Sequence, residues 1–239
     1  MLVAGFPAGP WGTNCYVIAT EANAECLIID PGKDSGAGIE EIVTEHGLKS
    51  VAVLLTHGHI DHVWSVIPVC GARGIPAFIH PDDRHMLSDP MSAISPQGAD
   101  MLASMTDGRL VAGEPDDLRL LSDGIELTIA GIDFIVDHAP GHTGGSVMFR
   151  RAETAQDPTI LLSGDVLFDG SIGRTDLPGG DHGQMLNSLR RKVLPLADTT
   201  VVLPGHGGTT TIGRERTSNP YLTALVAGGS SPSGPSRGL

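Results

Sequence analysis

The chain has 239 residues, of which 40% are hydrophobic and 18% are charged, and its formal net charge is −13. This composition is typical of a globular protein and argues against a largely disordered or membrane-spanning chain. No stretch gathers five or more Lys or Arg, so the negative charge also disfavours nucleic acid as a partner.

The N-terminal stretch, residues 1–20, has neither the basic start nor the uninterrupted apolar run of a signal peptide. No run approaches the ~18 apolar residues of a membrane helix. We therefore expect a cytoplasmic protein with no membrane partner. Cys15, Cys26 and Cys70 are widely spaced in apolar surroundings, which predicts reduced core cysteines rather than a disulfide framework or a zinc site.

Short apolar runs separated by turn residues recur along the chain and predict strands. These runs span 25–30, 51–55, 77–80, 125–139, 146–150, 159–165 and 200–205. Helical spacing of apolar residues predicts helices between them, at 36–47, 61–74 and 182–197. A mixture of hairpins with alternating strands and helices favours a layered α/β protein.

Two segments depart from this alternation. Residues 82–117 are rich in turn residues and predict a long excursion with a helical turn or two, which could be a binding loop or a solvent-facing insertion. Residues 228–239 are nearly all Gly, Ser and Pro and predict a disordered tail. We expect a single domain over residues 1–227.

The stretch "THGHIDH", residues 56–62, follows the apolar run "VAVLL" and holds four potential metal ligands: His57, His59, Asp61 and His62. In an extended segment alternate side chains share a face, so His57 and His59 can bind one ion. Asp61 and His62 then open a helix, where the chain turns and can offer a second pair to a neighbouring ion.

Three more candidates follow other apolar strands. His142 lies in the glycine-bounded turn "PGHTGGS", Asp165 follows "LLSG", and His206 follows "VVLPG". Glycine lets the backbone approach a site because it has no β-carbon. A donor set of five imidazoles and two carboxylates suits zinc, iron or manganese better than calcium.

We therefore predict two divalent metal ions per chain, with zinc as the first choice and iron or manganese as alternatives. The proposed ligands are His57, His59 and His142 for one ion and Asp61, His62 and His206 for the other, with Asp165 bridging the two. Such a pair of ions supplies hydroxide near neutral pH, which is the chemistry of a hydrolase.

Each residue has an ordinary alternative role: Asp61 could cap a helix, and His142 could be a turn residue. Independent turn residues have no reason to gather at four strand ends, which favours the metal site. The remaining histidines show no such placement and are predicted to lie on the surface or to support the ligands; they are His46, His80, His85, His138 and His182.

The ordered motifs "THGHIDH", "PGHTGGS", "SGD" and "PGHG" resemble those of the metallo-β-lactamase fold superfamily, from about residue 14 to residue 221. This resemblance implies an αββα sandwich of two mixed β-sheets flanked by helices, with the metals at one edge. "NCYVI", "LIIDPG" and the segments 170–181 and 210–222 are similar to the short glyoxalase II-like hydrolases.

The glyoxalase II-like resemblance implies hydrolysis of an S-acyl thiol, such as lactoylglutathione, by a metal-bridging hydroxide that Asp61 could also orient. Full-length glyoxalase II carries a further helical domain that holds the glutathione carboxylates. The sequence shows no counterpart after Tyr221, so the thiol carrier and the acyl group stay open.

Arg174, in a glycine-rich loop, could bind a substrate carboxylate, and a salt bridge with Asp176 is the alternative. The same "GRTD" occurs in related persulfide dioxygenases, whose single iron would here be held by His57, His142 and Asp165. We keep that enzyme as the alternative function. A secreted β-lactamase is disfavoured because no export signal is visible, and a non-catalytic module because no ligand is missing.

Overall fold

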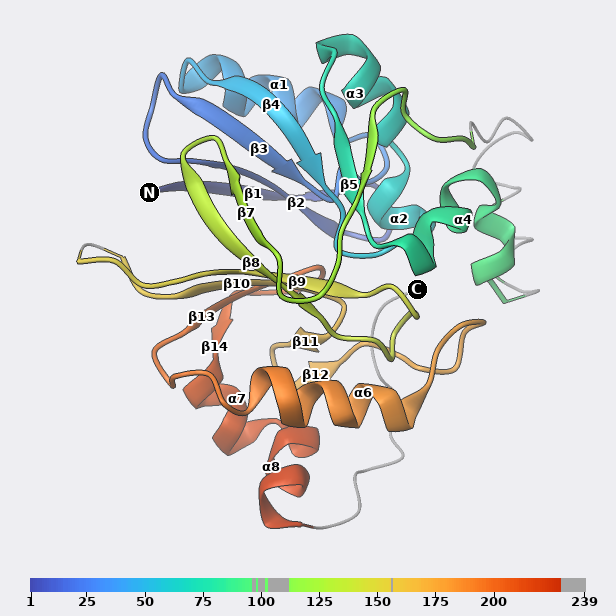
Figure 1. Ribbon diagram of the computed structural model, residues 1–239, viewed down its shortest axis with the longest axis vertical. Coiled ribbons are helices and arrows are strands. Elements are labelled where there is room, and N and C mark those ends of the chain that lie inside the picture. Colours follow the sequence, from blue (N-terminus) through green and yellow to red (C-terminus); the bar gives the residue numbers. More distant parts are fainter. Residues whose placement is uncertain (96–97, 99–101, 103–111, 156, 229–239) are drawn as a thin grey trace.

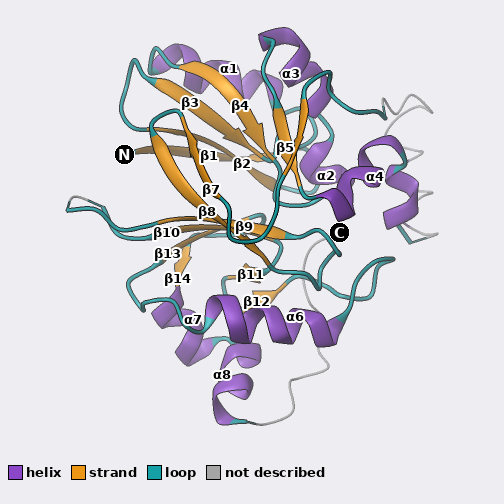
Figure 2. Ribbon diagram, in the orientation of Figure 1, coloured by secondary structure: helices purple, strands orange, loops and turns teal. Residues whose placement is uncertain are grey.

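Two six-stranded mixed sheets pack face to face, and helices cover their outer faces (Figures 1 and 2). This arrangement confirms the αββα sandwich that the sequence motifs imply. The computed structural model describes residues 1–95, 98, 102, 112–155 and 157–228. The predicted tail lies outside these residues except for Gly228, which ends the last helix.

The first sheet has the order β1-β2-β3-β4-β5-β6, with antiparallel pairing from β1 to β3 and parallel pairing from β3 to β6. Its strands are β1 (Leu2–Ala8), β2 (Thr13–Ala19), β3 (Glu25–Ile29), β4 (Lys49–Leu54), β5 (Ala77–Ile79) and β6 (Leu118–Leu120). The parallel strands β3 and β4 therefore end at the same edge of the sheet, close to the start of "THGHIDH".

The second sheet has the order β14-β13-β10-β9-β8-β7, and its one parallel pair is β10 with β13. Its strands are β7 (Glu126–Ile129), β8 (Ile132–His138), β9 (Val147–Arg151), β10 (Ile160–Gly164), β13 (Val201–Pro204) and β14 (Thr210–Thr211). A separate hairpin pairs β11 (Leu167–Phe168) with β12 (Ser171–Ile172).

Helices from the N-terminal half cover the first sheet, and helices from the C-terminal half cover the second (Figure 1). The first set is α1 (Gly36–Glu45), α2 (Ile60–Val63) and α3 (Val66–Arg73). The second is α6 (His182–Ser188), the π-helix η3 (Leu189–Val193), α7 (Ile212–Ser218) and α8 (Pro220–Ala227). Between β5 and β6 of the first sheet lie the short helices η1 (Pro81–Asp83), α4 (Arg84–Ser88) and η2 (Pro90–Ala93).

Three buried apolar clusters fill the three interfaces between the four layers. Strand residues alternate between them, because successive side chains of a strand point to opposite faces. In β9, Val147 and Phe149 face the opposite sheet, whereas Met148 faces α6. Leu161 and Leu162 of β10 divide in the same way. This burial on both faces explains why these strands are continuously apolar in sequence.

The structure corrects the predicted run 125–139, which is a hairpin of β7 and β8 rather than one strand. The turn falls at Ala130 and Gly131, whose φ angles of 54° and 70° are those of a tight hairpin turn. The predicted helix 61–74 is also broken, because the amide and hydroxyl of Ser65 donate to the carbonyls of Pro31 and Gly32.

The predicted strands did not include β1, β2, β6, β11, β12 and β14. Of these, β1 lies at the edge of its sheet and carries Gly5 and Pro7, which weaken a strand pattern and are tolerated at an edge. The described part of the 82–117 excursion contains short helices, in agreement with the predicted helical turns. All three cysteines are buried with free thiols, as expected. Among the described residues no helix is long and apolar enough to cross a membrane.

We predict that Phe149→Ala lowers the free energy of unfolding by about 3–5 kcal/mol. Phe149 is fully buried between the sheets and packs edge-on against Phe134, with ring centroids 6.3 Å apart. The measurement is urea-induced unfolding followed by circular dichroism. The control is Val226→Ala on α8, where the side chain is exposed and the change should stay within about 0.5 kcal/mol. Equal losses in both variants would contradict this account of the core.

Candidate metal centre

Four chain segments meet at one edge of the sandwich, and backbone hydrogen bonds join them. The Val147 amide at the start of β9 donates to the carbonyl of Thr56, at 2.8 Å, and thereby links the two sheets. The Gly205 amide donates to the carbonyl of Gly164, also at 2.8 Å, which holds the ends of the parallel strands β13 and β10 together. These bonds fix the spacing of the loops that carry the candidate ligands.

The structure brings all seven candidate ligands into this edge. Six of them are buried, and the seventh, the side chain of His206, is 14% exposed. Their donor atoms fall into three overlapping groups whose members lie within 4.8 Å of one another. The groups are His57, His59 and His142; His57, His62 and Asp165; and Asp61, His62 and His206.

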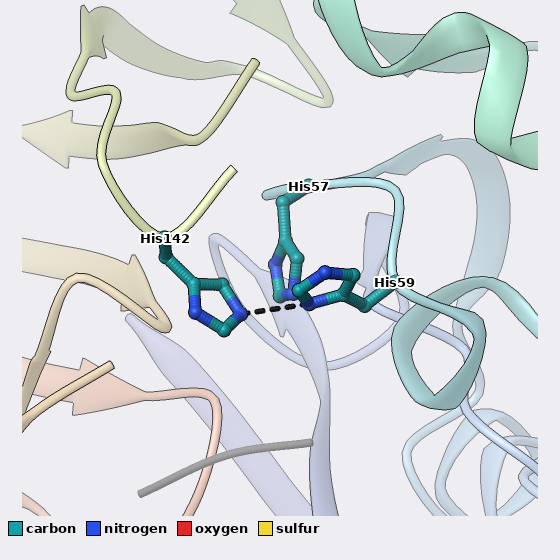
Figure 3. A group of neighbouring side chains, drawn as sticks. All are labelled: His57, His59 and His142. Carbon is teal, nitrogen blue, oxygen red and sulfur yellow. Dashed lines mark hydrogen bonds between the residues drawn. The ribbon is translucent and has the colours of Figure 1, made fainter. Parts of the chain in front are cut away.

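The three-histidine group consists of His57, His59 and His142, whose rings point toward one another from two different loops (Figure 3). The Nδ1 atom of His59 lies 2.8 Å from the Nε2 atom of His142. Ligand nitrogens about 2.1 Å from one tetrahedral zinc ion lie roughly 3.4 Å apart. The group is therefore close to the spacing that one ion requires.

In the group of Asp61, His62 and His206, Nε2 of His62 lies 3.3 Å from Nε2 of His206. The latter atom lies 3.1 Å from Oδ2 of Asp61. Asp165 lies between this group and the three-histidine group. Its Oδ1 is 3.3 Å from Nε2 of His62, and its Oδ2 is 3.5 Å from Nε2 of His142. One carboxylate thus offers an oxygen to each group, as a bridging ligand does.

Three of the imidazoles are held by the ring nitrogen that faces away from the group. Nδ1 of His142 lies 2.7 Å from the carbonyl oxygen of Arg174, and Nδ1 of His62 lies 2.9 Å from Oδ2 of Asp30. Nδ1 of His57 lies 3.1 Å from the Thr56 hydroxyl, which itself donates to Asp30. A proton on each Nδ1 leaves the Nε2 lone pair free to bind a metal.

Several buried donor atoms of the cluster have no hydrogen-bond partner among the described residues. They are Nε2 of His57, Nε2 of His59, Oδ1 of Asp61 and both carboxylate oxygens of Asp165. Buried polar atoms are rarely left without a partner, because their lost hydration costs free energy. A divalent cation would satisfy the atoms of His57, Asp61 and Asp165, so the residues present fit a metal centre and the cluster can hold two ions.

The pKa values of the three-histidine group are lowered. Burial lowers the pKa of His59 to about 3, with the neighbouring His142 acting in the same direction. Burial also lowers the pKa of His57 well below its ordinary value and lowers that of His142. These imidazoles are therefore neutral at physiological pH, which is the form that binds a metal.

The pKa values of His62 and His206 are raised rather than lowered. Burial opposes charge on His62 and His206, but Asp61 and Asp165 outweigh it and raise the pKa of both imidazoles. Burial likewise opposes ionisation of Asp61 and Asp165, yet the imidazoles hold the pKa of each carboxyl below its ordinary value. Both carboxylates are ionised, and a metal ion bound at this end would displace the protons of the two imidazoles.

Glycine is required at two positions beside the cluster. A β-carbon on Gly205 would collide with Oδ1 of Asp165 and with the ring of His62. Gly164 has a φ angle of 47° and packs against the Thr56 side chain. These close approaches support the interpretation of the flanking glycines in the sequence.

Asp30 and Asp83 were missed by the sequence analysis, although both contact the ligand loops. Asp30 follows the apolar strand β3, so the strand-end rule that selected Asp165 could have found it. Asp83 lies in η1, at the start of a polar excursion, where nothing in the sequence distinguishes it from its neighbours.

The remaining histidines lie outside the cluster. His80, Asp82 and His138 form another group with close donor atoms, but the two rings are stacked, 4.0 Å apart and inclined by 10°. The lone pairs of stacked rings lie in parallel planes and do not converge on one ion. His138 instead bonds the Gly144 carbonyl, at 2.8 Å, and so supports the turn that carries His142.

Arg174 contributes to the site through its backbone carbonyl, which accepts the hydrogen bond from His142. Its guanidinium is paired with the Asp176 carboxylate at 2.7 and 2.9 Å, in the bidentate geometry that the sequence left as the alternative. A contact with a substrate carboxylate stays a prediction.

Comparison with known proteins adds sequence relatives and structural neighbours. The chain is 34% identical to the hydroxyacylglutathione hydrolase GloC of Haemophilus influenzae, over 91% of this chain and 96% of that protein. It is 42% identical to the BLEG-1 B3 metallo-beta-lactamase structure, with a TM-score of 0.79, covering 93% of this chain and 100% of that one. For the TTHA1623 structure in a di-iron-bound form the identity is 38%, the TM-score 0.71 and the coverage 93% and 100%.

Residues 8–206 match the family model of the metallo-beta-lactamase superfamily, a span that contains all seven candidate ligands. The layered fold and the cluster at its edge agree with this match. The chain therefore belongs to the metallo-beta-lactamase superfamily.

Proposed function

We propose that this protein is a metal-dependent hydrolase that cleaves an S-acyl thiol, such as lactoylglutathione or a related thiol conjugate. The observation that carries the proposal is the position of Asp165, with one oxygen toward the three-histidine group and the other toward His62. A hydroxyacylglutathione hydrolase among the relatives supports the thioester as the substrate class.

In this proposal His57, His59 and His142 hold one ion, Asp61, His62 and His206 hold the other, and Asp165 bridges them. Zinc is our first choice, with iron or manganese as alternatives, and the di-iron-bound neighbour supports a centre of two ions. Bound there, the ions would lower the pKa of water to about 7 and polarise the acyl carbonyl.

Asp61 is suited to orient the attacking water. Its Oδ2 accepts a hydrogen bond from the Thr13 hydroxyl at 2.9 Å and lies 3.1 Å from Nε2 of His206. Its Oδ1 is buried and has no hydrogen-bond partner among the described residues, so it can accept a hydrogen bond from water in the site. The thiolate can leave unprotonated, because a thiol has a pKa near 8.5, so no separate general acid is required.

Two further statements belong to this proposal. Arg174 can release Asp176 and bind a substrate carboxylate, since both side chains are partly exposed. The protein works in the cytoplasm, where the three buried free thiols would remain reduced.

The decisive test combines metal analysis of the purified protein with assays of thioester hydrolysis, of oxygen uptake with a glutathione persulfide, and of β-lactam hydrolysis. We expect two ions per chain, thioester cleavage and no oxygen uptake. One iron with oxygen uptake would replace our proposal with the persulfide dioxygenase. Efficient β-lactam cleavage without thioesterase activity would instead place the protein with the B3 enzyme that it resembles.

Asp165→Ala should abolish the hydrolysis and lower the metal content, because it removes the bridging carboxylate. We expect a loss of more than about 100-fold, since changing even an outer partner of a metal ligand costs about 10- to 100-fold. His59→Ala should behave similarly. His85→Ala is the control, because His85 is exposed on α4 and belongs to none of the donor groups. Full activity in Asp165→Ala would refute the bridging role.

The metal-free protein should lose stability as the pH falls through the window between about 6.5 and 3. The pKa of His59 is about 3 in the folded protein and near 6.5 when unfolded, so acid protonates the unfolded chain first and favours it. Unfolding free energies of wild type and His59→Gln between pH 7 and 4 test this. The unfolding free energy of His59→Gln should depend less steeply on pH than that of wild type. Identical slopes for the two proteins would contradict the lowered pKa of His59.

A further inference from the structure

Asp83 is a fully buried carboxylate that lies outside the metal cluster. Its Oδ2 accepts hydrogen bonds from the Gly58 amide at 2.9 Å and the Thr143 hydroxyl at 2.6 Å. Its Oδ1 accepts a third from the Gly145 amide at 2.7 Å. Within the described part of the chain it forms no ion pair, so these three donors carry the stabilisation of a buried charge.

The three donors belong to the two segments that supply the three-histidine group. Gly58 lies between His57 and His59, and Thr143 directly follows His142. One carboxylate therefore bonds both segments at positions adjacent to all three imidazoles.

The packing around Asp83 leaves little freedom. A β-carbon on Gly145 would lie 2.6 Å from Cγ of Asp83, and one on Gly58 would lie 2.9 Å from the Asp83 carbonyl oxygen. The Thr143 hydroxyl also lies 2.8 Å from the Ser146 hydroxyl, which closes the turn that carries His142. The contacts thus bring η1, "THGHIDH" and the His142 turn into one fixed arrangement.

We propose that Asp83 is a positioning residue for the metal centre, which sets the distance between the His57–His59 loop and the His142 turn. It is not one of the metal ligands and acts through the Gly58 and Gly145 amides and the Thr143 hydroxyl. This inference rests on the metal centre of the proposed function. It also gives a role to the start of the 82–117 excursion, where Asp83 joins the two loops by hydrogen bonds.

The test measures metal affinity rather than hydrolysis. Cobalt(II) is titrated into metal-free wild type, Asp83→Asn and Asp82→Asn, with a chelator as competitor and the visible absorption of cobalt as the signal. In Asp83→Asn the side-chain NH₂ replaces one carboxylate oxygen and faces either the Gly145 amide or the donors on Gly58 and Thr143. Two facing donors cannot form a hydrogen bond, so the loops lose part of their support. One of the two cobalt ions should then bind about tenfold or more weakly, with an altered absorption spectrum. Asp82→Asn is the matched control, because the Asp82 side chain is 61% exposed, and it should bind like wild type.

A second pair of variants separates positioning from general stability. Thr143→Val removes the hydroxyl that donates to Asp83 and should also weaken one ion, whereas Thr143→Ser keeps the hydroxyl and should restore wild-type affinity. This pair decides the question if Asp83→Asn does not fold. Thermal unfolding of the metal-free variants is measured in parallel, since a purely structural role would lower the melting temperature and leave cobalt affinity and spectrum unchanged.

Unchanged affinity and spectrum in both Asp83→Asn and Thr143→Val would overturn the inference. The proposed function fails separately, if the wild type binds fewer than two ions or does not cleave thioesters. With a single bound ion the comparison still decides the role of Asp83, because the alternative iron site also takes ligands from both clamped segments, His57 and His142.

Discussion

The burial of six ionisable side chains, together with the partly exposed His206, at one edge of the sandwich is the constraint on which the site depends. Water is excluded from most of these donors, and several find no hydrogen-bond partner among the described residues. Burying such groups unpaired costs several kcal/mol unless a cation or a proton compensates them. Two carboxylates and five imidazoles converge there, and either protons on the imidazoles or bound cations can compensate the carboxylates. The fold therefore holds the cluster in an arrangement that metal binding relieves.

Hydrogen bonds from both sheets hold the loops that carry the candidate ligands in place. Asp30, directly after β3, accepts hydrogen bonds from the Thr56 amide and hydroxyl and lies within hydrogen-bond distance of Nδ1 of His62, which orients that ring. The Thr56 carbonyl accepts the amide of Val147 from the other sheet. Each ligand loop is thus bonded to its neighbours by groups that touch no metal. The contacts that join the two sheets therefore also hold the ligand loops together, and the inter-sheet core around Phe149 supports the site indirectly.

The sequence predicted those features that depend on local pattern. Continuous apolar runs located most of the buried strands, although β2 was missed. The Gly-flanked His and Asp residues after them located the candidate ligands that the structure brings together. Features set by tertiary contacts were missed: Ser65 breaks a helix because it bonds a distant loop, and β1 pairs as an edge strand despite Gly5 and Pro7. Asp83 is the clearest case, because its three donors lie 25 to 62 residues away in the chain.

The metal ligands alone do not choose the substrate, since similar chains include a hydroxyacylglutathione hydrolase and a B3 metallo-beta-lactamase. Selectivity must come from residues around the cluster, and Arg174 is the cation that the sequence analysis singled out. Its pairing with Asp176 does not exclude a substrate role, because exposed ion pairs contribute only about 0–1 kcal/mol. Asp176 is 69% exposed, so a substrate carboxylate can replace it at small cost. The pairing with Asp176 is therefore compatible with our proposal that the Arg174 guanidinium binds a substrate carboxylate.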